Sequence, residues 1–307
     1  MRIGIVDLDT SHPAAWIPIE REFGHEIVGI FDDGAVHPPG YAQKFAAEHK
    51  IANVFGSIEQ MVDRIDCAIV HSCDWDTHVA KARPFVEAGK AVLIDKPVGG
   101  NVRDLQQIKS WLKSGVRIAG GSSLRFCVEA QQWLAKPKCE RGTPQTVLCG
   151  CGVDEFNYGI HAYSMLAGII GSGARTVRHM GAAGQRRVQI RYADGGCGMV
   201  VVGQAASWLP FYTNIVTDKS LAQFIADNAK LYRALIEATL PFLSGQTDNP
   251  PLDVDAWLEP EMCALAARKS WLNGDREIAL TDLTDGDAYD GKAFAESYRK
   301  TRYPNGW

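Results

Sequence analysis

Short apolar runs alternate with amphipathic segments through the first 121 residues of the chain. The apolar runs are rich in β-branched residues, as buried strands are, and lie at 2–6, 26–31, 54–55, 67–71, 91–94 and 116–119. The segments between them space their apolar residues as helices do, most clearly at 13–23, 41–49, 77–90 and 102–113. Strands and helices in turn, with short links, predict a doubly wound parallel α/β sheet over residues 1–121.

The pattern changes after Gly121. Runs with strand-like alternation follow one another at 146–152, 176–183, 187–193 and 199–205, and a turn sequence at 193–196 joins two of them. Helical spacing returns in three segments. The first begins near His161, and the other two extend over 222–238 and 258–272. Residues 122–307 are therefore expected to form an α+β domain with an open, mostly antiparallel sheet and a C-terminal tail that packs back.

Length and charge narrow the class of protein. With 307 residues the chain is long enough for two cores, since single cores stop growing at about 250–300 residues. A formal charge of −4 disfavours nucleic acid, which selects a basic surface. No apolar stretch is long enough for a membrane span, and the eight cysteines lack the spacing of zinc sites or disulfide scaffolds. We therefore expect a cytoplasmic protein that acts on a small molecule, with no nucleic-acid or membrane partner.

One predicted strand ends in residues that suggest chemistry. The apolar run 92–94 is followed by Asp95-Lys96-Pro97, and proline cannot continue a strand. Ligands of open α/β sheets bind outside the carboxyl ends of the strands. Lys96 is therefore expected to point into an active crevice.

This block and two later ones resemble motifs of the glucose–fructose oxidoreductase / inositol dehydrogenase (Gfo/Idh/MocA) family. Asp95-Lys96-Pro97 is similar to the family's Glu-Lys-Pro, 121–126 to its Arg-Phe crossover, and 159–166 to its Gly-x-His helix start. The resemblance covers nearly the full length. It implies a Rossmann-like dinucleotide-binding domain (1–121), a substrate-binding and oligomerisation domain (122–307), and NAD(P)-dependent oxidoreduction of a sugar, polyol or related hydroxylated or keto compound.

The resemblance also implies roles for individual residues. Lys96 would lie beside the nicotinamide and the reacting carbinol, and His161 would accept the hydroxyl proton, since the ordinary pKa of histidine is about 6.5. Asn157 stands where the family carries aspartate, so it could orient His161 without stabilising an imidazolium by charge. Arg125 and Tyr158 are expected to contact the substrate.

The cofactor loop departs most from the family pattern. A dinucleotide fingerprint requires glycines at positions 7, 9 and 12, but this chain has Asp7, Asp9 and His12. A carboxylate about 5 Å from a phosphate charge costs roughly 3 kcal/mol at an effective dielectric near 20. The acids that end the second strand would repel a 2′-phosphate and favour NAD over NADP. The residues expected to contact the dinucleotide are Asp9, Thr10, Ser11, His12, Asp32, Asp33, Ser72, Asp74, His78 and Lys96.

Two other functions are consistent with the absence of the fingerprint glycines. Asp7, Asp9 and His12 could instead bind a divalent metal in a hydrolase, because carboxylate and imidazole groups are common metal ligands. Alternatively, a chain without the glycines could keep the fold as a non-catalytic binding module. In each case the open sheet of the second domain is expected to pair with another copy, in a homodimer or homotetramer.

Overall fold

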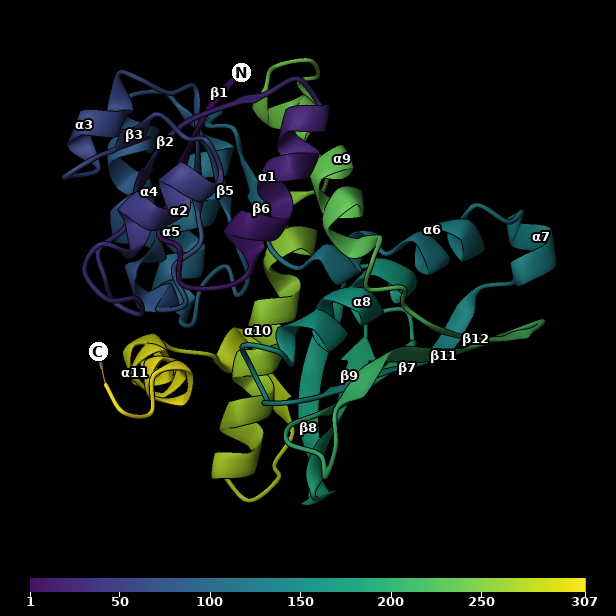
Figure 1. The fold of residues 1–307 in the computed structure, drawn as a ribbon. Helices are drawn as coiled ribbons and strands as arrows, with labels where there is room; N and C mark the ends of the chain where they lie inside the picture. The colour runs from purple at the N-terminus through teal and green to yellow at the C-terminus, as the bar shows by residue number, and fades with distance from the viewer. Residues whose placement is uncertain (307) are drawn as a thin grey trace.

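The computed structural model describes residues 1–306, which form two sheets with helices around them (Figure 1). The first sheet has six parallel strands in the order β3-β2-β1-β4-β5-β6. Its strands are β1 (Arg2–Val6), β2 (Glu26–Phe31), β3 (Asn53–Val54), β4 (Cys67–Val70), β5 (Ala91–Ile94) and β6 (Ile118–Gly120). The predicted doubly wound sheet is confirmed. Its order reverses between β1 and β4, at the switch point where such sheets bind ligands.

Helices connect these strands and cover the sheet. They are α1 (His12–Glu22), α2 (Tyr41–Glu48), α3 (Glu59–Val62), α4 (His78–Glu87) and α5 (Val102–Lys113), with a short 3₁₀ helix η1 (Trp75–Thr77) before α4. Local sequence explains their ends. Helix α5, for example, begins where the side chain of Asn101 accepts the N–H of Asp104 at 2.9 Å, and Gly115 follows its end with a φ of +91°.

The second sheet has seven strands in the order β12-β11-β7-β10-β9-β8-β13. Its strands are β7 (Pro144–Gly152), β8 (Ala174–Ala183), β9 (Gln185–Tyr192), β10 (Cys197–Val202), β11 (Leu209–Thr217), β12 (Leu221–Ile225) and β13 (Ile278–Ala279). Only β7 and β10 pair in parallel, so the expected mostly antiparallel sheet is confirmed. The remaining helices are η2 (Ser123–Phe126), α6 (Val128–Leu134), α7 (Lys138–Arg141), α8 (Ile160–Ile170), α9 (Leu231–Leu243), α10 (Val254–Leu272), η3 (Leu280–Asp282) and α11 (Gly291–Arg302).

The helix expected over 222–238 is wrong in its first part. Residues 221–225 form the edge strand β12, which pairs with β11, and α9 starts only after Lys230. The alternation of exposed and half-buried positions along β12 has a period of two, and pairing with β11 satisfies the backbone groups on one side of the strand.

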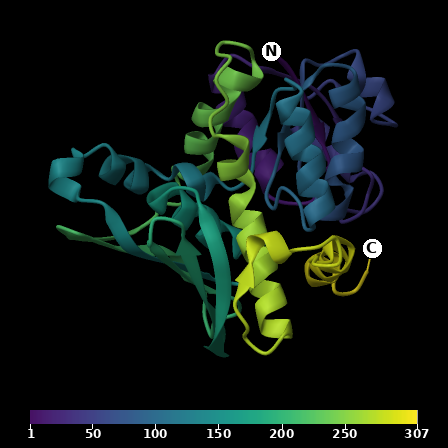
Figure 2. The ribbon, with the colours of Figure 1, turned by 180° about the vertical axis from the view of Figure 1, so that it is seen from behind.

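Helix α9 returns to the first sheet, although it follows the last long strand of the second. Its buried residues Leu235, Ile236 and Leu240 pack in one cluster with Ile3 and Trp16. Figures 1 and 2 show α9 beside α1, with α10 along the boundary of the two sheets. The cores of the two domains are thus joined by helices from the second half. Among the described residues, no helix is long and apolar enough to cross a lipid bilayer.

Helix α1 buries the carboxyl group of Glu20, which should make the folding stability of the protein depend on pH. Glu20 is 1% exposed, and neither carboxylate oxygen has a hydrogen-bond partner among the described residues. Burial raises its pKa to about 8, and the nearby charge of Arg21 opposes this only in part. The folded protein therefore holds this proton while the unfolded chain releases it near pH ~4.3, so folding stability falls as pH rises from there through about 8.

Glu20→Gln should weaken this pH dependence. We expect the free energy of unfolding, measured with urea at about pH 5 and about pH 8.5, to fall less in the variant than in the wild type. Some pH dependence should remain, because burial also raises the pKa of Asp9 to about 8 and of Glu261 to about 7. The exposed Glu87→Gln variant is the control and should behave as the wild type; identical pH dependence in Glu20→Gln would contradict the prediction.

Candidate active site

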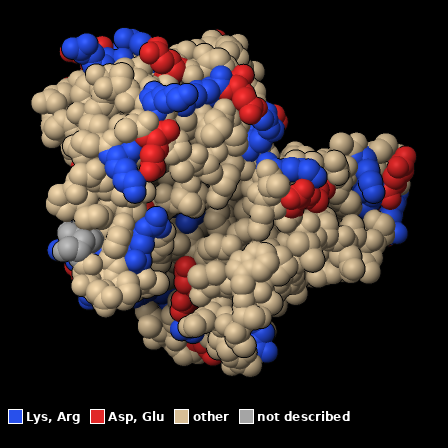
Figure 3. Space-filling view, viewed as in Figure 1, with Lys and Arg blue, Asp and Glu red and all other residues tan. Residues whose placement is uncertain are grey.

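A cavity of about 330 Å³ lies between the two domains, at the carboxyl edge of the first sheet. The surface is hollowed between the domains in Figure 3, and charged side chains on this face form small mixed groups. The cavity is lined from both domains and from α11 by Thr10, Ser11, His12, Cys73, Lys96, Ser123, Leu124, Asn157, Tyr158, His161, Phe211, Asn228, Leu231, Tyr232, Phe294 and Tyr298. Its volume is near the lower end of the roughly 300–1,000 Å³ typical of small-molecule sites.

Lys96 follows β5 and reaches the cavity, as the sequence predicts. Its Nζ donates to the side-chain oxygen of Asn157 at 2.9 Å and to the backbone oxygen of the same residue at 3.1 Å. Burial lowers the pKa of Lys96, although Asp95 and Asp154 act in the opposite direction. The result is a lysine that is 7% exposed, faces the cavity and releases its proton more easily than a surface lysine.

His161 also lines the cavity, from the first turn of α8. Its Nδ1 is 2.7 Å from the hydroxyl oxygen of Ser122. Burial, followed by the charges of Lys96 and His12, holds the pKa of His161 well below its ordinary value. The ring is therefore neutral at physiological pH. The expectation that Asn157 orients His161 is wrong, because the Asn157 carboxamide binds Lys96 and Ser122 binds the histidine.

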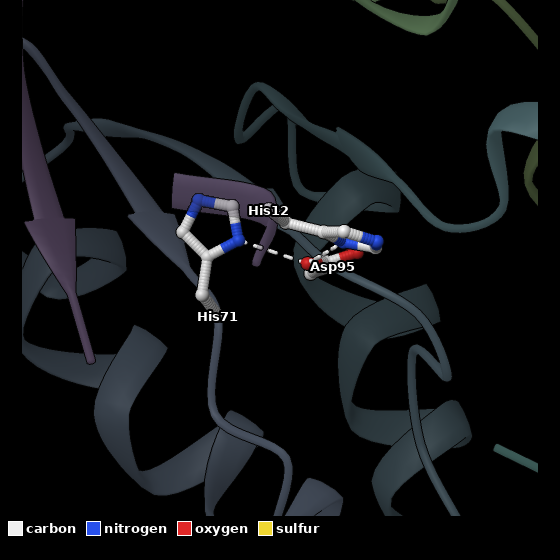
Figure 4. A group of neighbouring side chains, drawn as sticks. All are labelled: His12, His71 and Asp95. Atoms are coloured by element: carbon white, nitrogen blue, oxygen red, sulfur yellow. Dashed lines mark hydrogen bonds and ion pairs between the residues drawn. The ribbon is translucent and has the colours of Figure 1, made fainter. Parts of the chain in front are cut away.

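A third titratable group of the cavity comes from the loop region after β1. His12 begins α1, and its Nδ1 is 2.6 Å from Oδ2 of Asp95. Nδ1 of His71, at the end of β4, is 2.8 Å from the same oxygen, and Figure 4 shows both rings converging on it. Burial alone would raise the pKa of Asp95, but His12 and His71 hold it well below the ordinary value. Asp95 is thus an ionised carboxylate between two imidazoles.

A cluster of charged and polar side chains fills the carboxyl edge of the first sheet near the ends of β1, β2 and β4, on the side where a dinucleotide is expected. We call it the Lys81 cluster; it consists of Asp7, Asp33, Ser72 and Lys81. Nζ of Lys81 is 2.5 Å from Asp7 and 2.6 Å from Asp33, and Ser72 donates its hydroxyl to Asp7. Burial opposes the charge of Lys81, but the two carboxylates keep its pKa above the ordinary value. Asp7, at the position of the first fingerprint glycine, adopts a φ of +66°, in the left-handed region that favours glycine.

Two further acids flank the Lys81 cluster, the buried Asp9 and the half-buried Asp32. Oδ2 of Asp9 accepts the N–H of Cys73 at 2.8 Å, while Oδ1 has no partner among the described residues. Burial, and then the charge of Asp7, raises the pKa of Asp9 to about 8 and that of Asp32 to about 6. Asp9 therefore carries its proton at neutral pH.

Helix α11 covers this edge of the sheet from outside. Ala295 is buried with Val36, which follows β2, and with Cys73, which follows β4. Phe294 and Tyr298 pack on the same cluster and also line the cavity. The C-terminal helix therefore closes the loops between which a dinucleotide would lie.

The residue after α11 makes a second contact there. The hydroxyl of Tyr303 is 2.7 Å from Nδ1 of His37, and Nε2 of His37 is 3.0 Å from the carbonyl oxygen of Leu8. Burial and the charge of Arg302 lower the pKa of His37 to about 4. Because the ring is neutral and a carbonyl only accepts, Nε2 donates to Leu8 and Nδ1 accepts from Tyr303.

NAD or NADP does not fit this arrangement. Its pyrophosphate would meet Asp7 and Asp9 in place of glycines, and Asp33, one of the two acids expected at the ribose, already pairs with Lys81. The adenosine side is closed by α11. Binding would require the Lys81 cluster and α11 to move.

The metal site suggested by the sequence does not form. Two groups of possible ligands occur among the described residues, namely His12 with His71 and Asp95, and Asp7 with Asp32 and Asp33. Asp7 and His12 are thus in different groups, and Asp9 is in neither. In the first group, the distances of 2.6 and 2.8 Å from ring nitrogens to one oxygen are those of hydrogen bonds.

The other predicted site residues divide between the cavity and the interior. Thr10, Ser11 and Tyr158 line the cavity. Arg125, expected to bind substrate, is instead buried on η2 outside the cavity lining, where Leu124 takes its place.

His78 and Asp74 serve local structure near the switch point. His78 is buried, and its ring nitrogens lie 3.2 Å and 2.8 Å from the backbone oxygens of Val98 and Ser72. Asp74 caps η1 by accepting the N–H of Asp76 at 3.1 Å. Both residues are predicted to lie at the dinucleotide, and in the structure their side chains hold the loop after β4.

Several cavity residues had no recognisable signal in the sequence. Ser122 is the partner of His161, and Tyr232 on α9 packs its ring 5.0 Å from that of His12. Phe294 and Tyr298 come from α11. The positions of Tyr232, Phe294 and Tyr298 depend on helices that return from the far end of the chain, so no local pattern could reveal them.

Comparisons with known proteins agree with this architecture. Residues 1–119 match the sequence profile of the oxidoreductase family with an NAD-binding Rossmann fold, Gfo/Idh/MocA. A trans-1,2-dihydrobenzene-1,2-diol dehydrogenase of Danio rerio is 27% identical over 108 residues, which are 35% of this chain and only 30% of that protein.

Solved structures extend the similarity to the second domain. A scyllo-inositol dehydrogenase of Lactobacillus casei with bound NAD(H) and scyllo-inositol superposes with a TM-score of 0.75 at 15% identity, over 92% of this chain and 99% of its own. A UDP-N-acetylglucosamine 3-dehydrogenase of Acidithiobacillus ferrooxidans superposes with a TM-score of 0.71 at 16% identity, over 88% and 97%. These likenesses establish the two-domain fold. Residues 1–119, which the family model matches, are thus similar to the NAD-binding Rossmann domain of the Gfo/Idh/MocA oxidoreductases.

Proposed function

We propose that this protein is an oxidoreductase that acts on a small hydroxylated or keto compound, of sugar or polyol size, in the cavity between the two domains. The observation that carries the proposal is that Lys96 from the first domain and His161 from the second line one small cavity. The cavity also offers Asn157, Ser123 and Tyr158 as polar neighbours for hydroxyl groups.

The chain's own residues would bind the substrate and move its proton. Nζ of Lys96 can donate a hydrogen bond to the reacting oxygen and stabilise negative charge on it, since buried donors act strongly at such sites. His161 is neutral, so it can accept a hydrogen bond or a proton from a hydroxyl group at that position. Asn157 holds Lys96 in place for this role.

For the cofactor we propose NAD, bound only after the nucleotide cleft opens. The match of residues 1–119 to the NAD-binding family model supports a nicotinamide dinucleotide as the hydride carrier, and the acids Asp32 and Asp33 after β2 disfavour the additional phosphate of NADP. While α11 is docked, the apparent affinity for NAD should be weak. NAD binds only the molecules in which α11 has moved away, so the free energy of that movement is subtracted from the binding free energy.

Undocking α11 tests this proposal directly. Ala295→Glu introduces a charge between Val36 and Cys73, so we expect the variant to bind NADH at least about tenfold more tightly than the wild type in a fluorescence titration, a shift of ~1.4 kcal/mol. Ala293→Glu, an exposed position on the same helix, is the matched control and should bind as the wild type. NADPH should bind more weakly than NADH to every form.

The outcomes separate the candidate functions. Reduction of NAD by a panel of polyols and sugars, followed by absorbance, would support the oxidoreductase. No binding of either dinucleotide to the wild type or to Ala295→Glu would contradict it and favour a binding module. Stoichiometric zinc or manganese in the purified protein would favour a hydrolase.

We also propose that the protein assembles as a homo-oligomer through the second sheet. In the pairing of β11 with β12, Val216 lies opposite Leu221 and Tyr212 opposite Ile225, and three of these side chains are large, apolar and exposed. Such an apolar face is costly to leave in water. Light scattering at micromolar concentration should give a dimer or tetramer, and Leu221→Lys with Ile225→Lys should dissociate it; a wild-type monomer would contradict the proposal.

A further inference from the structure

The sequence segment that replaces the cofactor glycines ends in a histidine that the proposed function leaves unused. His12 lines the cavity, its side chain is 12% exposed, and its ring is fixed on two sides. Trp16, one turn along α1, stacks on it with ring centroids 5.3 Å apart, and Tyr232 of α9 packs edge-on at 5.0 Å. The ring therefore has a defined orientation.

The hydrogen bond to Asp95 decides which nitrogen of His12 carries the proton. A carboxylate only accepts hydrogen bonds, so Nδ1 of His12 must donate to Oδ2 of Asp95 across the 2.6 Å contact. In the neutral ring this leaves Nε2 with a free lone pair. Figure 4 shows this second nitrogen turned away from His71.

His161 lacks such a partner. Its Nδ1 contacts the hydroxyl of Ser122, and the residues four positions before and three positions after it are the uncharged Asn157 and Ser164. A hydroxyl cannot stabilise an imidazolium by charge as a buried carboxylate does. In this cavity, the histidine paired with a carboxylate is His12.

We propose, building on the proposed function, that His12 is the general base of this site and that Asp95 orients it. Nε2 accepts the proton of the substrate hydroxyl: the O–H bond breaks, its electron pair stays on oxygen, and a new N–H bond forms on His12. Asp95 remains ionised and stabilises the resulting imidazolium. Lys96 hydrogen-bonds the substrate oxygen, and His161 contacts the substrate as a neutral partner.

His71 acts as a positioning residue. It donates Nδ1–H to the same oxygen of Asp95 at 2.8 Å, and its Nε2 is buried without a partner among the described residues. The other oxygen of Asp95 accepts the backbone N–H of Lys96 at 2.7 Å. The carboxylate is thus held at both oxygens, which fixes His12 relative to Lys96.

The protonation of His12 can be tested before any substrate is known. In the full chain labelled with ¹⁵N-histidine, long-range ¹H–¹⁵N spectra at about pH 8.5, where an ordinary histidine is neutral, should show His12 protonated on Nδ1 and bare on Nε2. Signals lost in His12→Gln assign it, and Asp95→Asn should abolish the single tautomer. A wild-type His12 that carries its proton on Nε2 would overturn the proposal.

Two further measurements test the role of His12, namely the chemical accessibility of its ring and the turnover of a His12 variant. Diethyl pyrocarbonate, mapped by mass spectrometry, should modify His12 through Nε2 and spare the buried His71; the reverse order would overturn the proposal. With a substrate from the polyol and sugar panel, His12→Gln should lower kcat by about 10²–10⁴-fold with a smaller effect on KM. Full kcat in a folded His12→Gln would overturn the role of His12 and leave the proposed function standing. A panel without any turnover would count against the proposed function alone.

Discussion

Lys96→Ala is expected to lower turnover by about 10²–10⁴-fold, the usual worth of a positioned proton donor or acceptor. The variant removes the only lysine among the described cavity-lining residues and leaves the Asn157 carboxamide without its donor. His161→Ala should have an effect of similar size. The double variant should be little worse than either single one, because residues that act as a unit are not additive. Steady-state kinetics with the best polyol or sugar of the panel give the measurement.

Two further variants show whether the loss comes from the site. Lys113→Ala, at the exposed end of α5, should leave turnover unchanged. Asn157→Asp should place a carboxylate 2.9 Å from Nζ and raise the pKa of Lys96, so that the alkaline limit of activity moves to higher pH if the protonated lysine is required. Full activity of Lys96→Ala would end the argument for this site.

Trp75→Ala should be among the most destabilising single changes in the chain, at about 3–5 kcal/mol. Trp75 follows β4 of the first sheet but is 2% exposed within the core of the second. Its ring packs 5.0 Å from Phe156 and 5.1 Å from Phe294, and its Nε1 donates to the backbone oxygen of Tyr289 at 3.1 Å. Truncation therefore leaves a cavity where both domains and α11 meet.

Urea unfolding measures the loss, and an exposed tryptophan gives the comparison. Trp208 is 55% exposed and donates one long hydrogen bond to Tyr158, so Trp208→Ala should cost at most about 1 kcal/mol. Because Phe294 loses its support, Trp75→Ala should also loosen α11 and strengthen NADH binding, as Ala295→Glu does. Equal stability of the two tryptophan variants would refute the structural role of Trp75.

The sequence was most informative where short-range patterns decide the structure. The strands and helices of the first 121 residues follow from runs of β-branched residues and from capping, and Lys96 follows from a strand that ends at proline. The sequence was least informative for 221–243. There a strand and a helix adjoin, and only pairing with β11 shows that residues 221–225 are extended. The period of two along so short a segment cannot be separated from a helix start without its partner.

The partners of the site residues also depended on long-range packing. Asn157 is four residues before His161, yet its carboxamide binds Lys96 from the other domain. Arg125 lies within a motif that suggested substrate binding, but the 3₁₀ helix η2 turns its side chain into the interior. Sequence spacing gives the residue types near a site, whereas side-chain direction depends on the elements that pack around them.

The sequence alone determined the two-domain architecture, the loss of the cofactor glycines and the presence of Lys96 and His161, because local periodicity and residue identity are sufficient for each. Only the tertiary structure decided that Lys81 pairs with Asp7, one of the acids replacing those glycines, that Asp95 pairs with His12, and that α11 closes the nucleotide side. The partners of the first contact are 74 positions apart in the sequence, and those of the second are 83 positions apart. The residues of α11 are more than 200 positions from those that they cover. Such contacts depend on chain reversals that no local pattern encodes, so their chemistry becomes visible only in the folded molecule.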